Sequence, residues 1–282
     1  MSEEFSADRP IATKTEDKFQ RYEFAKRVAK TISNRKNEDC IVIGLYGAWG
    51  EGKTSLVNFI ESELINDENI ICVKFNPWRY NDENALLIQF FQKLAKTLDT
   101  NLKTKNEKAG ELLKKYGKLL NIDIPILGNI GETLNNTGDV LDNVDIETLK
   151  SRLEGILKST SSKVVVFIDD IDRLDKGEIH SIFRLVKLTA DFANTTYILS
   201  FDEEMVSAAI GERFGQGDQK SGQNFLEKII QVPLKIPTAQ PETLKNFCFE
   251  IIDNIIKSNN IELTENEVRR FVYHFTNNIF YV

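Results

Sequence analysis

The 282-residue sequence contains few cysteines and histidines, and this scarcity excludes several kinds of site. Its three cysteines, Cys40, Cys72 and Cys248, lie far apart, and no two of them form a C-x-x-C pair. An odd, scattered set of cysteines does not indicate a disulfide framework, and two histidines are too few to assemble a zinc-ligand spacing. We therefore expect a protein of a reducing, cytoplasmic compartment.

Long hydrophobic runs and an excess of positive charge are also missing. The longest apolar stretches end well before the roughly 18 residues that a membrane span requires. Residues 1–5 are acidic and lack the basic start of a signal peptide. Because 43 acidic residues outnumber 36 lysines and arginines, the formal net charge is −7, which argues against sequence-independent nucleic-acid binding as the main role. The sequence predicts a soluble protein without a membrane span.

What the sequence does contain is an alternation of short apolar runs with helical periodicities. Hydrophobic residues make up 41% of the chain and charged residues 28%, which are ordinary values for a globular protein. Strands that are nearly all apolar and are separated by helices indicate an α/β fold, with a parallel sheet covered on both faces. The predicted strands are short and rich in β-branched residues, and they lie at 41–46, 70–75, 163–168, 197–201 and 231–236.

Some regions depart from this alternation. Residues 100–162 are polar, and we interpret them as an insertion with weak helices. Residues 215–222 predict a Gly-rich loop, followed by a helical piece at 224–230. Beyond the strand that stops at Pro237, the tail is helical and amphipathic. We expect one domain over residues 1–237 and a helical appendage over 238–282.

The segment Gly47–Thr54 fits the phosphate-loop pattern G-x-x-x-x-G-K-[ST], and a predicted strand enters it and a predicted helix leaves it. Glycines permit the left-handed backbone that turns N–H groups toward phosphate oxygens, and the helix start adds partial positive charge. Lys53 would supply charge for the β- and γ-phosphates, and the Thr54 hydroxyl would bind magnesium. The matching flanks favour nucleotide binding over a Gly-rich turn that binds nothing.

The second motif is acidic and follows the apolar run at 163–168. Asp169 comes directly after this strand, at the sheet edge where α/β proteins bind ligands, and is predicted to hold magnesium directly or through water. Asp170 is the candidate to polarise the attacking water. The alternative is that Asp170 and Asp172 cap the next helix or pair with Arg173.

A further polar residue follows the strand at 197–201. If this strand lies between those at 41–46 and 163–168, Asp202 or Ser200 would be placed to orient the lytic water. The alternative, that Asp202 is the N-cap of the next helix, is equally consistent with the sequence.

Aromatic residues crowd the end of the strand at 70–75, which Pro77 interrupts. Trp78 and Tyr80 would brace the phosphate loop, and Arg79 would reach a γ-phosphate or a neighbouring subunit. On physical grounds alone, the simpler interpretation that the aromatics cover the sheet edge is favoured.

Three of these segments, Gly47–Ser55, Phe75–Tyr80 and Phe167–Arg173, together resemble the KAP family of P-loop NTPases. Asp8–Ile11 and Phe225–Pro233 resemble the beginning and the last strand of that domain. The resemblance implies an ATPase core related to the AAA+ and STAND groups, with strand order 5-1-4-3-2 and a helical lid. Bacterial relatives include proteins that block phage growth. Many relatives carry transmembrane helices between the two motifs, where this chain is polar.

The resemblance also assigns roles to individual residues. It implies ATP as the nucleotide and a catalytic position for Lys228. Together with the roles argued above, the expected cofactors are ATP and Mg²⁺, the metal ligands are Thr54 and Asp169, and the catalytic residues are Lys53, Asp170, Asp202 and Lys228. Lys228 stands where AAA+ relatives have an arginine finger, with Arg213 as a rival, and a lysine lacks the bidentate fork. No second sensor arginine is found in the tail, so the lid is expected to be incomplete. The nucleotide would be bound by Gly47, Ala48, Trp49, Gly50, Glu51, Gly52, Lys53, Thr54 and Ser55.

The sequence leaves two functional hypotheses open. The first is a Mg²⁺-dependent ATPase that acts as a mechanochemical switch, slow in isolation because a second copy or a partner protein supplies a basic residue. The second is a signalling or interaction module that binds ATP and barely hydrolyses it. A small-molecule kinase is disfavoured because no acceptor lid follows the phosphate loop. Adenine is implied by the resemblance, since no guanine-reading Asn-Lys-x-Asp segment is present.

Overall fold

The computed structural model describes residues 9–79, 83–105, 146–159, 162–189, 192–214 and 219–280. These residues form two compact units. The first contains residues 9–12 and 25–236, and the second contains residues 13–24 and those from 237 onward. Most of the polar insertion expected at 100–162 lies outside the described residues.

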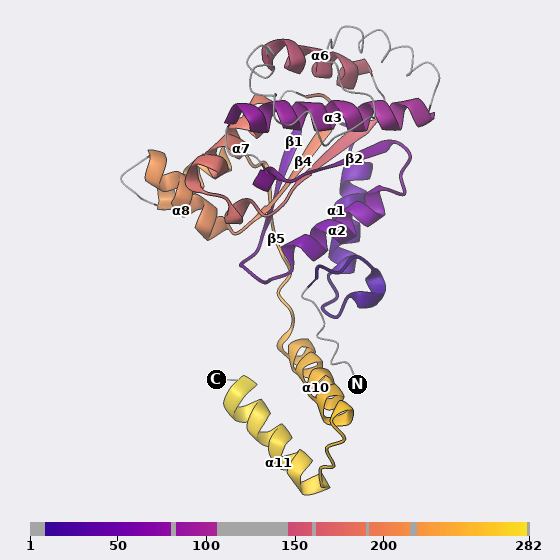
Figure 1. Ribbon diagram of the computed structural model, residues 1–282, viewed down its shortest axis with the longest axis vertical. Coiled ribbons are helices and arrows are strands. Elements are labelled where there is room, and N and C mark those ends of the chain that lie inside the picture. Colours follow the sequence, from indigo (N-terminus) through magenta and orange to yellow (C-terminus); the bar gives the residue numbers. More distant parts are fainter. Residues whose placement is uncertain are drawn as a thin grey trace, which may run out of the picture. The chain divides into compact units, whose positions relative to one another are not determined.

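A five-stranded parallel sheet is the centre of the first unit (Figure 1). The spatial order is β2-β3-β4-β1-β5, which confirms the predicted α/β fold and the order 5-1-4-3-2. Strand β4 does lie between β1 and β3 and pairs with both. The strands are β1 (Ile41–Tyr46), β2 (Ile70–Phe75), β3 (Lys163–Ile168), β4 (Thr195–Phe201) and β5 (Val232–Lys235).

The register of the strands brings the chemically interesting residues to one edge of the sheet. Tyr46, the last residue of β1, is opposite Phe201 of β4, and Ile168, the last residue of β3, is opposite Leu199. Because all the pairs are parallel, the segments that follow β1, β3 and β4 leave the sheet at the same edge.

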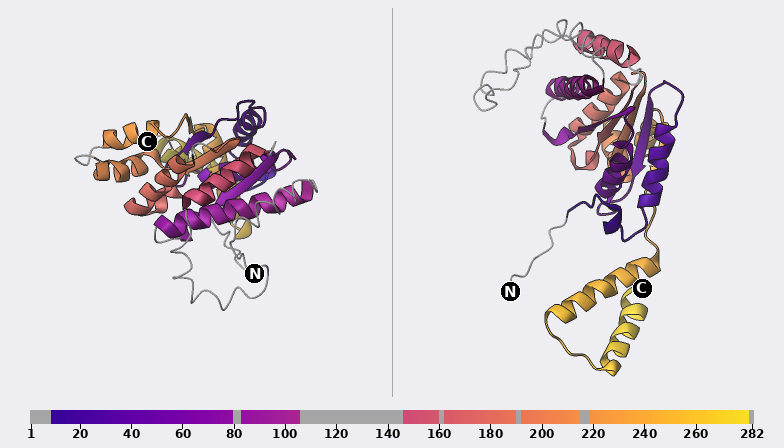
Figure 2. Two further views of the ribbon diagram at one scale, coloured as in Figure 1. Left: turned by 90° about the horizontal axis from the view of Figure 1, so that it is seen from above. Right: turned by 90° about the vertical axis from the view of Figure 1, so that its right-hand side faces the viewer.

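Helices cover both faces of this sheet. One apolar cluster joins alternate strand residues to α3, α6, α7, α8 and α9, whereas the buried residues of α1 and α2 lie outside this cluster. Figure 2 shows α1 and α3 on opposite sides of the sheet. The helices of this unit are α1 (Tyr22–Ser33, which begins in the second unit), α2 (Lys53–Leu64), α3 (Glu83–Lys105), α6 (Ile146–Ser159), α7 (Lys176–Leu188), α8 (Glu203–Phe214) and α9 (Gln219–Glu227).

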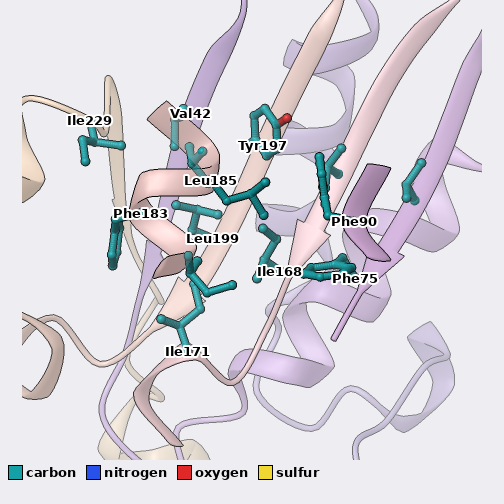
Figure 3. Packing of buried hydrophobic residues seen from close by; sticks show 14 of the residues in the cluster. Val42, Phe75, Phe90, Ile168, Ile171, Phe183, Leu185, Tyr197, Leu199 and Ile229 are labelled. Carbon is teal, nitrogen blue, oxygen red and sulfur yellow. The ribbon is translucent and has the colours of Figure 1, made fainter. Parts of the chain in front are cut away.

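Aromatic rings fill the core beneath α3 and α7 (Figure 3). The Phe75 ring of β2 meets the Phe90 ring of α3 edge-on, with centroids 5.2 Å apart. The hydroxyl of the fully buried Tyr197 donates to the Thr189 hydroxyl over 2.7 Å. Burial raises the pKa of Tyr197 above its usual value, so this phenol stays neutral and its polar atom has a partner.

The contact between α8 and α9 corrects the sequence interpretation of residues 215–222. Helix α9 already begins at Gln219, so Gly222 lies inside a helix rather than in a loop. A Cβ atom on Gly222 would lie 1.8 Å from the Ser207 carbonyl oxygen of α8. Glycine is therefore present here because the two helix backbones approach closely, and not because the chain turns.

Replacing Gly222 with alanine is expected to destabilise the first unit by about 1–3 kcal/mol, because the methyl group forces two backbones apart. The measurement is the free energy of unfolding from urea denaturation. Gly155→Ala in α6 is the matched control. It also replaces a glycine inside a helix, but a Cβ atom at this position meets no atom within 4 Å. That variant should be neutral or more stable by up to about 1 kcal/mol. Equal effects of the two substitutions would contradict the close approach.

The second unit contains α10 (Pro241–Ser258) and α11 (Glu265–Phe275), followed by a π-helical turn, η4 (Thr276–Phe280). The helical character predicted for the tail is confirmed. Thr264 and Glu267 form a capping box at the start of α11. Residues 13–24 belong to this unit as well: the Phe19 and Phe247 rings meet edge-on at 5.5 Å, and Lys18 pairs with Glu250. Among the described helices, none combines the length and apolarity needed to cross a membrane.

Candidate nucleotide-binding site

The loop between β1 and α2 has the backbone that its glycines predict. Gly50 and Gly52 have φ values of +81° and +76°, in the left-handed region that other residues rarely adopt. Gly52 is the N-cap residue of α2, which begins at Lys53. The first turn of a helix has N–H groups without intrahelical acceptors, so the loop and helix start together form an anion-binding geometry.

The side chain of Lys53 is held against this loop. Its ammonium group donates to the carbonyl oxygens of Gly47 and Ala48 over 3.0 and 3.2 Å. It also forms an ion pair with Asp172, with 2.9 Å between Nζ and Oδ2. Both side chains are buried, at 8% and 1% exposure. The lysine is therefore fixed at the mouth of β1, next to the loop that would hold phosphates.

The role of Asp172 differs from both alternatives considered from the sequence. It does not cap α7, because Asp175 accepts the N–H of Glu178 there, and its ion-pair partner is Lys53 rather than Arg173. Its position follows from η3 (Ile171–Arg173), whose Ile171 is fully buried in the core. The signal available in the sequence was the third acid after an apolar strand, at a spacing that turns it back toward the phosphate loop.

Two buried polar atoms at this edge have no hydrogen-bond partner among the described residues: Asp172 Oδ1 and Ser200 Oγ. The other carboxylate oxygen, Asp172 Oδ2, accepts the backbone N–H of Asp202 over 3.3 Å as well as the lysine. A buried polar atom without a partner costs on the order of 1–3 kcal/mol. Such atoms are concentrated where a protein binds something else, and here both lie at the edge that carries the phosphate loop.

Asp169 and Asp170 follow β3 at the same edge. Asp169 is half-buried, and its Oδ1 accepts the N–H of Asp170 over 2.9 Å. Asp170 has a left-handed backbone, with φ +59°, and its Oδ1 lies 2.9 Å from Nε of Arg173. Burial raises the pKa of Asp170 above that of an ordinary aspartate, and the neighbouring charge of Asp169 raises it further. A carboxylate with a raised pKa is a better proton acceptor at neutral pH.

Of the remaining predicted site residues, Asp202 lies at this edge directly after β4, whereas the others are exposed or lie outside the described residues. The Asp202 carboxylate accepts the N–H groups of Glu204 and Met205, so it caps α8, and a part in orienting water stays a prediction. Lys228 follows α9 and is exposed. Trp78 is 56% exposed, and Tyr80 and the side chains of Arg79 and Arg213 lie outside the described residues.

The donor set present fits a Mg²⁺–nucleotide complex. The hydroxyl of the half-buried Thr54 and the carboxylate of Asp169 are oxygen ligands, which Mg²⁺ prefers, and it is commonly bound by one or two protein oxygens together with substrate phosphates and water. Ser55 also has a structural role at this helix: its hydroxyl accepts the N–H of Ile11 over 3.2 Å and so fastens the N-terminal segment to α2.

Known proteins resemble this chain in sequence. The profile of the KAP family P-loop domain matches residues 21–279. The "Phage T7 exclusion protein" of Escherichia coli (strain K12) is 26% identical over 271 residues, and the match covers 85% of this chain and 36% of that protein. The chain therefore spans about a third of the length of this relative.

Solved structures are similar to this chain at low sequence identity. The ORC2 protein of Aeropyrum pernix in its ADP form has a TM-score of 0.43 at 13% identity, covering 83% of this chain and 51% of that one. Cdc6p of Pyrobaculum aerophilum has a TM-score of 0.47 at 12% identity, covering 87% and 51%. The family profile, in contrast, matches nearly the whole chain and includes the loop, the acidic turn and all five strands. This protein belongs to the KAP family of P-loop NTPase domains.

Proposed function

We propose that this chain binds ATP with Mg²⁺ and hydrolyses it slowly, as a switch that moves its C-terminal helices. The observation that carries the proposal is the placement of Lys53. Its buried ammonium group lies between two phosphate-loop carbonyls and a carboxylate from the turn after β3. Catalysis of this kind is positioning and charge neutralisation, with no covalent intermediate.

Each residue of the edge has a distinct task in this proposal. The amides of the loop and the start of α2 bind phosphate oxygens, and Lys53 exchanges part of its contact with Asp172 for the β- and γ-phosphates. Thr54 and Asp169 hold Mg²⁺, which supplies charge neutralisation when bound. Asp170 accepts a proton from the attacking water and holds that water in line with the γ-phosphate.

The exposed Lys228 and the second unit complete the proposal. Lys228 would supply positive charge to a site in a second copy of the chain, which makes turnover dependent on assembly. We propose that residues 238–282 act as an incomplete lid that responds to loss of the γ-phosphate. The similarity to a protein named for phage T7 exclusion supports a role in phage defence.

One observation favours the alternative of a nucleotide-binding module that barely hydrolyses ATP. The Asp170 carboxylate is already paired with Arg173, which competes with an attacking water for the same oxygen. The position proposed for charge in trans also holds a lysine, which lacks the planar fork of arginine.

Release of phosphate from ATP tests the proposal. With Mg²⁺ present, the wild-type protein should release phosphate, and the rate per chain should rise with protein concentration because a second copy contributes Lys228. Removing the metal with EDTA should lower the rate at least tenfold, since Thr54 and Asp169 then have no cation to hold against the phosphates. Phosphate release that does not need Mg²⁺ would contradict the proposed metal site. A rate per chain that does not change with protein concentration would contradict the contribution of a second copy.

A further inference from the structure

Arg173, in the turn after β3, contacts both Asp170 and the phosphate loop. Its Nε lies 2.9 Å from Oδ1 of Asp170, the proposed water-polarising group. Its Cζ atom lies 4.7 Å from the ring centroid of Trp49, the third residue of the phosphate loop. The pairing of Asp170 with Arg173 was one of the alternatives left open by the sequence. The contact with Trp49 was not predicted, because Arg173 and Trp49 are 124 positions apart.

The chemistry of a guanidinium group allows both contacts to exist at once. Its edge carries N–H donors that match a carboxylate, and its flat face stacks on an aromatic ring. The indole of Trp49 is 61% exposed, so the ring is not held by a hydrophobic core, and the Arg173 guanidinium lies over it. A lysine would keep the charge but would lose the fork and the flat face.

Trp49 lies where a change in the phosphate loop must move it. The carbonyl oxygen of the preceding residue, Ala48, accepts a hydrogen bond from Lys53, and the Ala48 N–H donates to the Glu51 carboxylate over 2.9 Å. The following residue, Gly50, has a left-handed backbone and no atom within 4 Å of a Cβ position, so the loop is unobstructed there. Trp49 therefore adjoins the Ala48 carbonyl, one of the acceptors of the lysine that would contact a bound phosphate.

Asp170 is the second group that the Arg173 guanidinium contacts. A left-handed backbone is strained for a residue with a side chain, and it persists where surrounding contacts enforce it. Here Arg173 contributes two of them, the ion pair and a backbone N–H that donates to the Asp170 carbonyl over 3.2 Å. The orientation of this carboxylate therefore depends on where the guanidinium lies.

We propose that Arg173 is a positioning residue that couples the phosphate loop to Asp170. In the structure the guanidinium lies over the Trp49 ring and pairs with Oδ1 of Asp170. When the loop closes on phosphates, the indole moves, the guanidinium follows it, and Asp170 takes the orientation that suits the attacking water. This inference rests on the proposed function, and it adds the means by which occupancy of the loop is transmitted to the water-polarising group.

The test uses the emission of Trp49 and the steady-state kinetics together. Trp49 and Trp78 are the two tryptophans of the chain, so Trp78→Phe leaves Trp49 as the sole reporter. In this background, ATP with Mg²⁺ should change the emission in a saturable way. Arg173→Gln should reduce this change by more than half and should alter the emission before nucleotide is added. The affinity for ATP, measured by calorimetry, should stay within threefold.

Phosphate release separates positioning from structural support. In Arg173→Gln and Trp49→Ala, kcat should fall at least tenfold while KM changes less than threefold, and Arg173→Lys and Trp49→Phe should recover part of the loss. Lys158→Gln is the matched control, since it removes an exposed ion pair with Glu154 on α6 and should change neither readout. If the parent protein binds ATP without releasing phosphate, the emission change alone decides the question.

The outcomes are distinguishable. A parent protein that does not bind ATP contradicts the proposed function and the inference together. A parent protein that binds ATP contradicts the inference alone if Arg173→Gln changes neither the emission response nor kcat and Trp49→Ala leaves kcat unchanged. A large loss of ATP affinity in Arg173→Gln would also overturn it, because Arg173 would then be a ligand of the nucleotide.

Discussion

Replacing Lys53 with alanine is expected to abolish the thermal stabilisation that ATP and Mg²⁺ give to the wild-type protein. A ligand that binds only the folded state stabilises it by about 2.7 kcal/mol at a hundred times its Kd. The variant loses the ammonium group that contacts the β- and γ-phosphates, so its Kd rises and this stabilisation disappears. Differential scanning fluorimetry with and without ATP and Mg²⁺ measures the effect.

The same substitution has a second effect that must be separated from the first. Lys53 is the ion-pair partner of the buried Asp172, and removing one partner of a buried pair costs about 3–5 kcal/mol. Lys53→Ala should therefore unfold at a lower temperature even without nucleotide. The double variant Lys53→Met with Asp172→Asn carries no buried unpaired charge, so it should recover most of this stability and still show no shift with ATP.

Lys163 offers a matched control for Lys53. It is half-buried and donates to the carbonyl of Ser33, but it lies at the beginning of β3, at the sheet edge opposite the phosphate loop. Lys163→Ala should therefore lose some stability and keep the full ATP-dependent shift. The nucleotide site would be wrongly placed if Lys53→Ala kept that shift, or if Lys163→Ala lost it.

A structural feature of this protein can be predicted from the sequence when the residues that determine it lie close together along the chain. The strands are predictable because β-branched apolar runs are local, and their parallel arrangement follows from the intervening helices. The phosphate loop is predictable for the same reason: Gly47–Thr54 contains its own turn glycines, lysine and hydroxyl. The order of the strands came from the family resemblance.

The pairings between the phosphate loop and the turn after β3 are not local, and the sequence does not determine them. Lys53 meets Asp172 because Ile171 anchors η3 in the core, which turns the next side chain toward the loop. The stacking of Arg173 on Trp49 depends on the same turn. Gly222 was wrongly predicted to lie in a loop, because glycines are typical of loops. It lies inside α9, where the close approach of the α8 backbone requires a glycine. In each case the deciding contact lies on another helix, turn or loop.

Replacing Asp170 with asparagine is expected to lower kcat for phosphate release by about 10²–10⁴-fold, the range that general base catalysis contributes. An amide cannot accept the proton of the attacking water, whereas the residues assigned to phosphate and Mg²⁺ are untouched. The affinity for ATP should therefore stay within a few-fold of the wild type. Asp175→Asn is the matched control, because asparagine also caps helices well and this residue only caps α7.

The pH dependence of the wild-type rate gives an independent check on the same carboxylate. Asp170 acts as a base only when it is ionised, and its pKa is raised by burial and by Asp169. The rate should thus begin to fall, as the pH is lowered, at a higher pH than the value near 4 typical of an aspartate. Asp170→Asn should lose this limb of the profile along with its activity.

Three results of this comparison lead to different mechanisms. A normal rate in Asp170→Asn would show that another group, such as Asp202 or Ser200, positions the water. Undetectable release in both the wild type and Asp170→Asn, with ATP binding intact in each, would favour the module that holds nucleotide without turning it over. A loss confined to Asp170→Asn is the outcome we expect, because that carboxylate is the one acid of the turn after β3 assigned neither to Lys53 nor to the metal.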